Sequence, residues 1–222
     1  MEKQMVETVD IESEPGFNEN NLWTEQLTQE LAWVKFWQTP WLVAHSSWLG
    51  SEALSVNAAE IAVISQRCPR LLRQKLQLSE CFPPKPESTL LNFVCCDFSA
   101  RMHVLLLATE VVKPGFALAE NEIDAPTREW CRRLAKAIRP GKWAITQAYS
   151  QPLSYLSGCL LKQWVPRDMW PRLKLLFNRQ WIEQVESISI PNHGVAKTPA
   201  AKLHQLWQAV IWRAELDLDK GA

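Results

Sequence analysis

The stretch LLNFVCCDFSARMHVLLLATEVV, from Leu90 to Val112, decides the fold class of this chain. Its apolar residues fall on more than one side of a helix, and a helix that is apolar on several sides is buried by its neighbours. We therefore expect a central buried helix, or a pair of helices, with the other elements packed around it. Residues 103–112 also have some strand character, because Val and Leu dominate that short run.

Helix caps and prolines divide the rest of the chain into further helices. Asp124 is a predicted N-cap, Pro126 lies in the first turn that follows, and this helix ends near Ile138. A last helix follows the predicted cap Thr198 and carries an apolar stripe of period 3.6. The stripe consists of Leu203, Leu206, Trp207, Val210, Ile211 and Ala214. Further helices are predicted at about 51–66, 69–78, 152–164 and 168–186.

Glycine usage supports the same fold class. The chain has 222 residues but only 7 glycines, and it contains no Asn-Gly or Asp-Gly pair of the kind that tight β-hairpins need. Its length is sufficient to bury a sizeable core. The sequence therefore predicts a mainly α fold, in the form of a compact multi-helix domain.

The N-terminal region differs from the rest in composition. Residues 1–20 are polar and acidic, so we expect a short disordered acidic tail there and a single helical domain over residues 21–222. A helix capped by Asn21 is predicted to run to about Trp37, with its apolar face formed by Leu27, Leu31 and Val34 at i, i+4 and i+7. The proline-rich segment FPPKPE, residues 82–87, is a candidate subdomain boundary or a loop within one domain.

The formal net charge is zero, but the charges are unevenly distributed. Residues 1–30 contain eight acidic residues and one basic residue, whereas residues 125–181 contain eleven basic residues and two acidic ones. Such asymmetry is typical of a partner surface, of nucleic-acid binding or of an acidic tail that shields a basic face. A set of ordinary solvated helix faces explains it equally well.

The sequence indicates a cytoplasmic protein without membrane insertion. No stretch has the roughly 18 apolar residues of a membrane span, and the acidic N-terminus lacks the apolar segment of a secretory signal. The six cysteines have no CxxC spacing and lie mostly in apolar helical contexts, which is typical of reduced, buried thiols.

Residue spacing argues against a metal, a cofactor or a catalytic site. The four histidines are far apart in the sequence, with no HxxxH or HExxH pair, and the chain has no GxSxG, Walker or GxGxxG motif. We therefore predict no catalytic, metal-binding or cofactor-binding residues. The alternative is a small helical enzyme whose site is assembled from distant residues, around His103 or around Cys131 beside Arg132 and Arg133.

The helix TREWCRRLAKAIRPGKW, residues 127–143, is the main candidate for a partner surface. Its predicted partner-binding residues are Arg128, Arg132, Arg133 and Arg139. Interleaved Trp130 and Trp143 leave nucleic-acid binding open as a second alternative, because bases stack on aromatic rings. The pI of about 6.9 argues against that alternative, so no nucleic-acid partner is expected.

The stretch FWQTPWLVAHSSWLG, residues 36–50, is predicted to be a structural corner. Pro40 should end the first helix, Trp41 and Trp48 should cover the core, and His45 should be hydrogen-bonded in the turn. His45 has no ligand or nucleophile partner at useful spacing, so packing is the preferred interpretation of this histidine.

The same stretch resembles a motif near the N-terminus of the SctK family, the YscK/OrgA-type accessory proteins of bacterial type III secretion systems. The matching residues are Phe36, Pro40, His45 and Leu49. The tyrosine usual two places before the histidine is Val43 here, and the proline after it is Ser46. A second resemblance in the C-terminal half comprises Trp143, Pro152-Leu153, Leu160-Leu161, Pro166 and Trp170.

The resemblance implies a mainly α, non-enzymatic adaptor of the cytosolic sorting platform. Members of the family link the cytosolic domain of the inner-membrane ring protein, SctD, to the pod protein, SctQ. The expected partners are therefore SctD-type and SctQ-type proteins, and the expected location is the cytosolic face of the secretion apparatus, peripheral to the inner membrane. The resemblance supplies no catalytic, cofactor or metal residues to transfer.

Overall fold

The structure, a computed structural model, describes residues 19–48, 56–116, 123–143, 155–188 and 200–219. Within these residues it is mainly α and compact, with no strand, so the predicted fold class is confirmed. The α-helices are α1 Glu19–Gln38, α2 Ala58–Arg67, α3 Pro69–Lys75, α4 Ser88–Cys95, α5 Phe98–Val112, α6 Ala125–Ile138, α7 Leu156–Trp164, α8 Trp170–Leu173, α9 Arg179–Ser187 and α10 Ala200–Asp219. Short 3-10 turns lie at η1 Pro40–Leu42, η2 Ser46–Trp48, η4 Pro140–Lys142 and η7 Lys174–Leu176.

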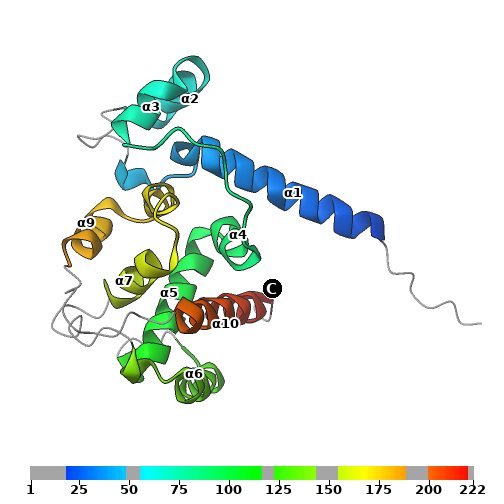
Figure 1. Ribbon diagram of the computed structural model, residues 1–222, viewed down its shortest axis with the longest axis vertical. Coiled ribbons are helices and arrows are strands. Elements are labelled where there is room, and N and C mark those ends of the chain that lie inside the picture. Colours follow the sequence, from blue (N-terminus) through cyan, green and yellow to red (C-terminus); the bar gives the residue numbers. More distant parts are fainter. Residues whose placement is uncertain (1–18, 49–55, 117–122, 144–154, 189–199, 220–222) are drawn as a thin grey trace, which may run out of the picture.

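The stretch from Leu90 to Val112 forms a pair of helices, α4 and α5, at the centre of the molecule (Figure 1). The pair is divided at Asp97, whose carboxylate caps α5 by accepting a hydrogen bond from the Ala100 N–H at 2.7 Å. Residues 103–112, which had some strand character in the sequence, belong to α5. This helix is surrounded by α6, α7 and α10, and Val104, Leu107 and Val111 are fully buried.

The predicted stripe of the last helix is confirmed, because all six of its residues are buried in α10. Trp207 is the largest of them. Its ring stacks on Trp164 of α7, with centroids 5.5 Å apart and planes inclined by 21°, and meets the edge of Phe93 of α4 at 6.1 Å. α10 therefore closes the core over both α4 and α7. The predicted cap Thr198 lies outside the described residues.

The predicted apolar face of the first helix is wrong. Leu27, Leu31 and Val34 of α1 are exposed. The neighbouring face of the helix is buried instead, and it carries Trp33, Phe36 and Trp37. Trp33 Nε1 donates to the Pro84 carbonyl and Trp37 Nε1 to the Cys81 carbonyl, each at 2.9 Å. Aromatic rings bury more surface than Leu or Val, and these two indoles also find acceptors.

The start of α1 differs from the prediction. α1 already includes Glu19 and Asn20, so Asn21 lies inside the helix instead of capping it. The rest of the predicted acidic tail, residues 1–18, lies outside the described residues.

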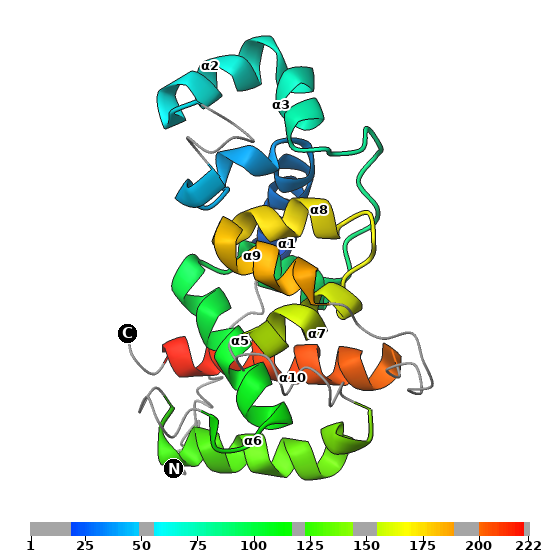
Figure 2. The same ribbon diagram turned by 90° about the vertical axis from the view of Figure 1, so that its left-hand side faces the viewer.

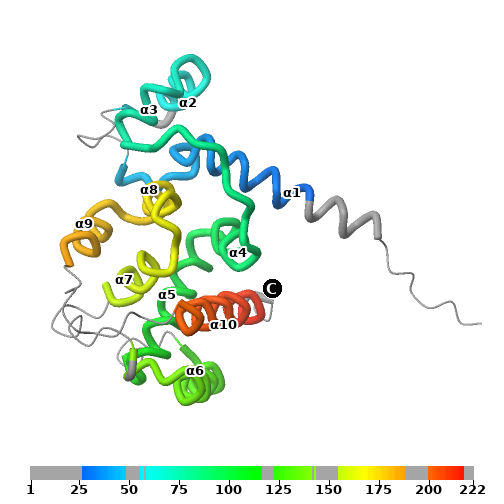
Figure 3. Tube along the Cα trace, viewed as in Figure 1, coloured from blue at the N-terminus to red at the C-terminus, as the bar shows by residue number. Residues whose placement is uncertain are grey.

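The proline-rich segment at 82–87 runs from α3 past α1 to α4 (Figure 3) and contacts α1 through Pro84.

Local caps explain two further elements. Asp124 caps α6 as predicted, accepting from the Thr127 N–H at 2.8 Å, and Arg139 ends this helix with a left-handed φ of 53°. The helix predicted at 168–186 is instead divided into α8, η7 and α9. The break follows Phe177, because the Asn178 side chain accepts hydrogen bonds from two N–H groups and starts a new helix.

The helices are arranged along one long axis (Figures 1 and 2). The α2–α3 pair lies at one end and α6 lies at the other, while α5, α7 and α10 occupy the space between them (Figure 2). This arrangement separates the surfaces at the two ends.

Candidate functional site

The structure brings the two candidate catalytic residues to one interface, between α5, α6 and α10. His103 Nε2 of α5 lies 3.5 Å from Asp217 Oδ2 of α10, and Asp217 pairs with Arg213 at 2.9 Å. Arg213 also donates to the hydroxyl of Thr127 on α6 at 2.6 Å. These side chains thus join three helices through polar contacts.

Cys131 in the same region has the wrong protonation state for a nucleophile. Its side chain is fully buried, and burial raises the pKa of its thiol to about 12, with a further contribution from the negative charge of Glu110. A catalytic cysteine needs a lowered pKa, because the thiolate is the reactive species. Glu110 itself accepts a hydrogen bond from the Gly115 N–H at 2.8 Å and so secures the turn after α5.

The described residues contain no cluster of three His, Cys, Asp or Glu side chains that could hold a metal ion. His193 lies outside the described residues. His204 is 4.0 Å from Glu87, across the surface between α10 and the start of α4.

Hydrogen bonds connect the corner at residues 40–48 to segments far away in the sequence. Trp48 Nε1 donates to the Phe177 carbonyl at 2.9 Å, the His45 N–H donates to the Leu175 carbonyl at 2.8 Å, and Trp41 Nε1 bonds Ser65 Oγ at 3.0 Å. Pro40, Trp41 and Trp48 are buried. The corner therefore connects α1 to α2 and to the η7–α9 region.

His45 makes local contacts in this corner. The Ser47 N–H donates to His45 Nδ1 at 3.1 Å, and Ser47 Oγ lies 2.9 Å from the same atom. Because Nδ1 accepts the hydrogen bond from the Ser47 N–H, the ring hydrogen of a neutral imidazole lies on Nε2. Ser47 Oγ also accepts from the Arg179 N–H at 2.8 Å, and the His45 ring contacts Phe98 with centroids 5.6 Å apart. His45 thus links the corner to the start of α5, and Ser47 links it to the start of α9.

The predicted basic helix is α6, and its arginines do not all lie in one environment. Arg132, Arg133 and Arg139 are exposed, and the first two lie 3.7 and 3.4 Å from Glu129. Arg128 turns back along the chain: its Nη2 donates to the Ile123 carbonyl at 2.8 Å, and its Nε is buried. The exposed α6 face is therefore formed by Arg132, Arg133, Lys136 and Arg139.

The tryptophans of this region face inward. Trp143 is buried, and its Nε1 donates to the Ile138 carbonyl at 2.8 Å. Trp130 packs against the core, and the Arg213 guanidinium lies 5.8 Å from its ring. Neither ring is interleaved with the arginines of the exposed α6 face, so the stacking platform that single-stranded nucleic acid needs is not formed there.

A second basic surface, which the sequence interpretation missed, lies at the end of the molecule near α3. A groove of about 440 Å³ is bounded by the end of α1, α3, residues 79–83 and α8. Its principal lining residues are Trp37, Arg70, Arg73, Glu80, Phe82 and Arg172. We call it the α3 groove.

Arg172 forms the inner wall of the α3 groove. It is buried and donates to three backbone carbonyls, those of Trp37 at 3.0 Å, Asp168 at 3.2 Å and Ser79 at 2.6 Å. Its guanidinium lies 4.0 Å from the centroid of the Trp37 ring, which is a close cation–π contact. Arg172 thus holds α1, α8 and the segment after α3 together.

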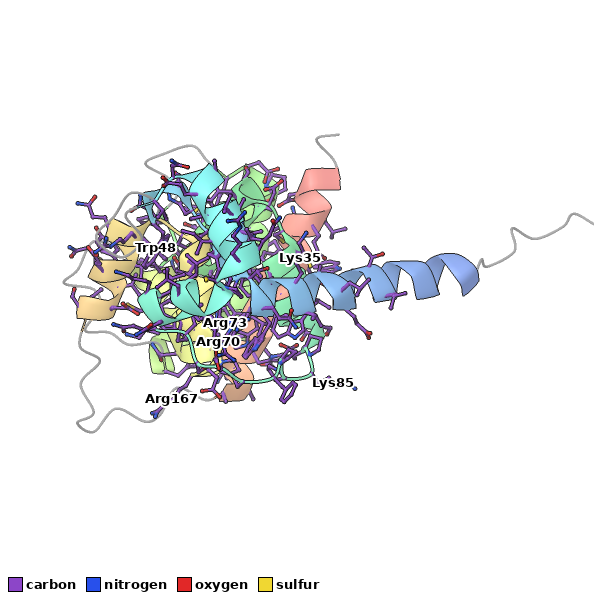
Figure 4. The ribbon with its side chains drawn as sticks, turned by 90° about the horizontal axis from the view of Figure 1, so that it is seen from above. Lys35, Trp48, Arg70, Arg73, Lys85 and Arg167 are labelled. Carbon is purple, nitrogen blue, oxygen red and sulfur yellow. The ribbon has the colours of Figure 1, made fainter. Side chains whose placement is uncertain are left out.

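Exposed basic residues also lie on the segments next to those that bound the α3 groove, namely Lys85 and Arg167. In the view from above, Arg70, Lys85 and Arg167 lie on one side of the line of α1, whereas Lys35 and Trp48 lie on the other (Figure 4). Arg70 and Arg73 belong to α3, Lys85 to the proline-rich segment and Arg167 to the turn before α8.

Comparison with known proteins finds no protein-family model, no curated protein and no solved structure that matches the chain. Among the described helices, none combines the length and the apolar character that crossing a membrane requires.

Proposed function

We propose that this chain is a non-enzymatic adaptor that joins two protein partners. The observation that carries the proposal is the position of the two basic surfaces, since the α6 face and the α3 groove lie toward opposite ends of the long axis (Figure 2). An adaptor needs two separate surfaces that can be occupied at once. Charged surfaces of this kind give specificity for acidic partners and accelerate association.

The resemblance to the SctK family indicates which two proteins are the proposed partners. One is the cytosolic domain of an SctD-type ring protein, and the other is an SctQ-type pod protein. The adaptor then acts in the sorting platform of a type III secretion system, at the cytosolic face of the inner membrane and peripheral to it. No nucleic acid takes part in this function.

Two features of the described residues support an adaptor over its rivals. An enzyme built around Cys131 is disfavoured by burial of the thiol and by its raised pKa. A nucleic-acid-binding role is disfavoured because Trp130 and Trp143 point away from the exposed α6 face.

The proposal is tested by co-purification of the tagged chain from its native host. We expect SctD-type and SctQ-type proteins to accompany the wild-type chain. Reversing two charges, with Arg132→Glu and Arg133→Glu, should remove one of them and retain the other, because only the α6 face changes. The loss should be larger at low salt, where surface charges are less screened.

The matched control is the double substitution Arg132→Lys and Arg133→Lys, which keeps both positive charges and should keep both partners. Melting curves of both variants must match the wild type, so that any loss reflects the surface and not the fold. The proposal fails if no secretion protein accompanies the wild-type chain. The α6 face is excluded if charge reversal leaves both partners bound.

A further inference from the structure

The positive charge of the α3 groove is only partly balanced by acidic residues of the chain itself. Arg70 Nε and Arg73 Nη1 lie 3.9 and 3.7 Å from the same oxygen of Glu80, so one carboxylate serves two guanidinium groups. The carbonyls that accept hydrogen bonds from Arg172 belong to the backbone and carry no net charge. The groove therefore has an excess of positive charge.

Nearby charges act on the Arg172 guanidinium in both directions. Burial lowers the pKa of Arg172, Cys81 and Asp168 raise it, and the positive charge of Arg73 lowers it. A negative charge placed in the groove would act in the opposite direction and favour the charged guanidinium groups. The electrostatic environment thus favours an anionic ligand.

The groove also offers apolar surface. The Phe82 side chain at its rim is 96% exposed, whereas the Trp37 ring in its wall is buried against the Arg172 guanidinium. Aromatic residues at a basic groove can bury an apolar side chain of a ligand and exclude water from the neighbouring charges. A ligand that combines carboxylates with an apolar side chain would use both properties, whereas a bare anion would use only the first.

The extent of the surface indicates an extended ligand. The volume of about 440 Å³ exceeds what a single small anion fills. Lys85 is exposed and lies two residues after Pro83, which lines the groove. An extended ligand that leaves the groove along this segment therefore meets further positive charge.

We propose that the α3 groove binds an acidic peptide segment of a partner protein, with carboxylates on Arg70 and Arg73 and an apolar side chain against Phe82. This inference rests on the proposed function, because it states what one of the two partners presents to the adaptor. A partner segment of this kind is extended, rich in Glu or Asp, and carries an aromatic or large aliphatic residue.

The test measures binding of a labelled synthetic peptide, in which glutamates flank a single phenylalanine, to the full chain by fluorescence anisotropy. Arg70→Glu with Arg73→Glu should weaken binding by about tenfold or more, since paired charges become like charges. Phe82→Ala should weaken binding about threefold to tenfold. The same charge reversal at Arg132 and Arg133 on the α6 face is the matched control and should change binding less than about twofold.

Two controls keep the test independent of folding. The Arg73 guanidinium lies 6.0 Å from the Trp41 ring, so its replacement could perturb the fold. The Arg70 side chain is 88% exposed, so Arg70→Glu alone should weaken peptide binding without changing the melting temperature. Peptides with Gln for Glu, or with Ala for the phenylalanine, should each bind more weakly than the original peptide.

Several results would overturn the inference. Equal losses for the two charge reversals would mean non-specific attraction. Displacement of the peptide by low concentrations of inorganic phosphate, together with no effect of Phe82→Ala, would mean a small-anion site. Tighter peptide binding after neutralisation of Glu7, Asp10, Glu12 and Glu14 would mean that the chain's own acidic segment occupies the groove.

The two proposals can fail separately. If the groove variant loses the peptide while both secretion proteins still co-purify, the adaptor role stands and the groove serves another partner. If the peptide binds as expected but no secretion protein accompanies the chain, the groove stands and the proposed function fails.

Discussion

At the scale of single residues, Gly158 marks the closest approach between α7 and α9. A Cβ atom at this position would lie 2.6 Å from both Trp181 Cη2 and Val185 Cγ2, well inside van der Waals contact. Val185 is buried, and an indole ring moves only as a whole, so neither neighbour can yield easily.

We therefore expect Gly158→Ala to destabilise the protein by about 1–3 kcal/mol, the usual cost of overpacking a core. Urea unfolding would measure the change. The control is Gly141→Ala, because a Cβ there meets nothing within 4 Å, and its effect should stay within about 0.5 kcal/mol. Equal effects of the two substitutions would contradict the tight contact.

Cys131 gives a second prediction at this scale. Because burial raises the pKa of its thiol to about 12, it should remain protonated and react slowly with iodoacetamide at about pH 8. The exposed thiols of Cys68 and Cys81 provide the internal comparison. Mass spectrometry of partly alkylated native protein should find those two modified first. Faster labelling of Cys131 would revive the interpretation of this residue as a nucleophile.

At the scale of elements, α1 shows how residue type decides which face is buried. The spacing of Leu27, Leu31 and Val34 suits an amphipathic helix, and the sequence alone favours that face. The structure buries the face that carries Trp33 and Trp37, because their indoles reach backbone carbonyls of residues 81–84. Those acceptors are 51 and 44 residues away in the sequence, so helical periodicity contains no information about them.

This difference gives a prediction for two positions on one helix. Trp33→Ala should cost about 3–5 kcal/mol, as expected for a buried aromatic side chain, and it also removes the bond to Pro84. Leu31→Ala on the exposed face should change stability by less than about 0.5 kcal/mol. Chemical denaturation of both variants checks the assignment of the two faces. A larger loss for Leu31→Ala would restore the original interpretation.

Elements with strong local signals could be predicted. Asp124 starts α6, the stripe of α10 is buried, and Leu90–Val112 forms the centre of the fold, because caps and apolar periodicity act within a few residues. The break between α8 and α9 was missed. There, capping by Asn178 outweighs the helical pattern that continues across it.

At the scale of the whole molecule, the two basic surfaces differ in how far they could be predicted. The exposed α6 face comes from one helix, so its arginines are visible as a pattern in the sequence. The α3 groove combines Arg70 and Arg73 with Arg172, which lies far along the chain. The contact between Arg172 and Trp37 spans 135 residues, and only tertiary packing brings such positions together.

The two basic surfaces are separated along the long axis of the molecule. The elements that carry them, α6 and α3, lie toward opposite ends of the molecule (Figure 2). Reversing charge at one end should therefore leave binding at the other end unchanged, in keeping with the additivity of distant substitutions.

The stacked indoles of Trp164 and Trp207 also give the molecule an optical property. Two chromophores 5.5 Å apart and inclined by 21° couple their electronic transitions, and such coupling produces a paired signal in circular dichroism that isolated tryptophans lack. The signal depends on contact between α7 and α10. Trp33 and Trp37 of α1 form a second close pair, with centroids 6.0 Å apart. The part of the signal that Trp164→Phe removes therefore reports the docking of the last helix separately from the formation of helical backbone.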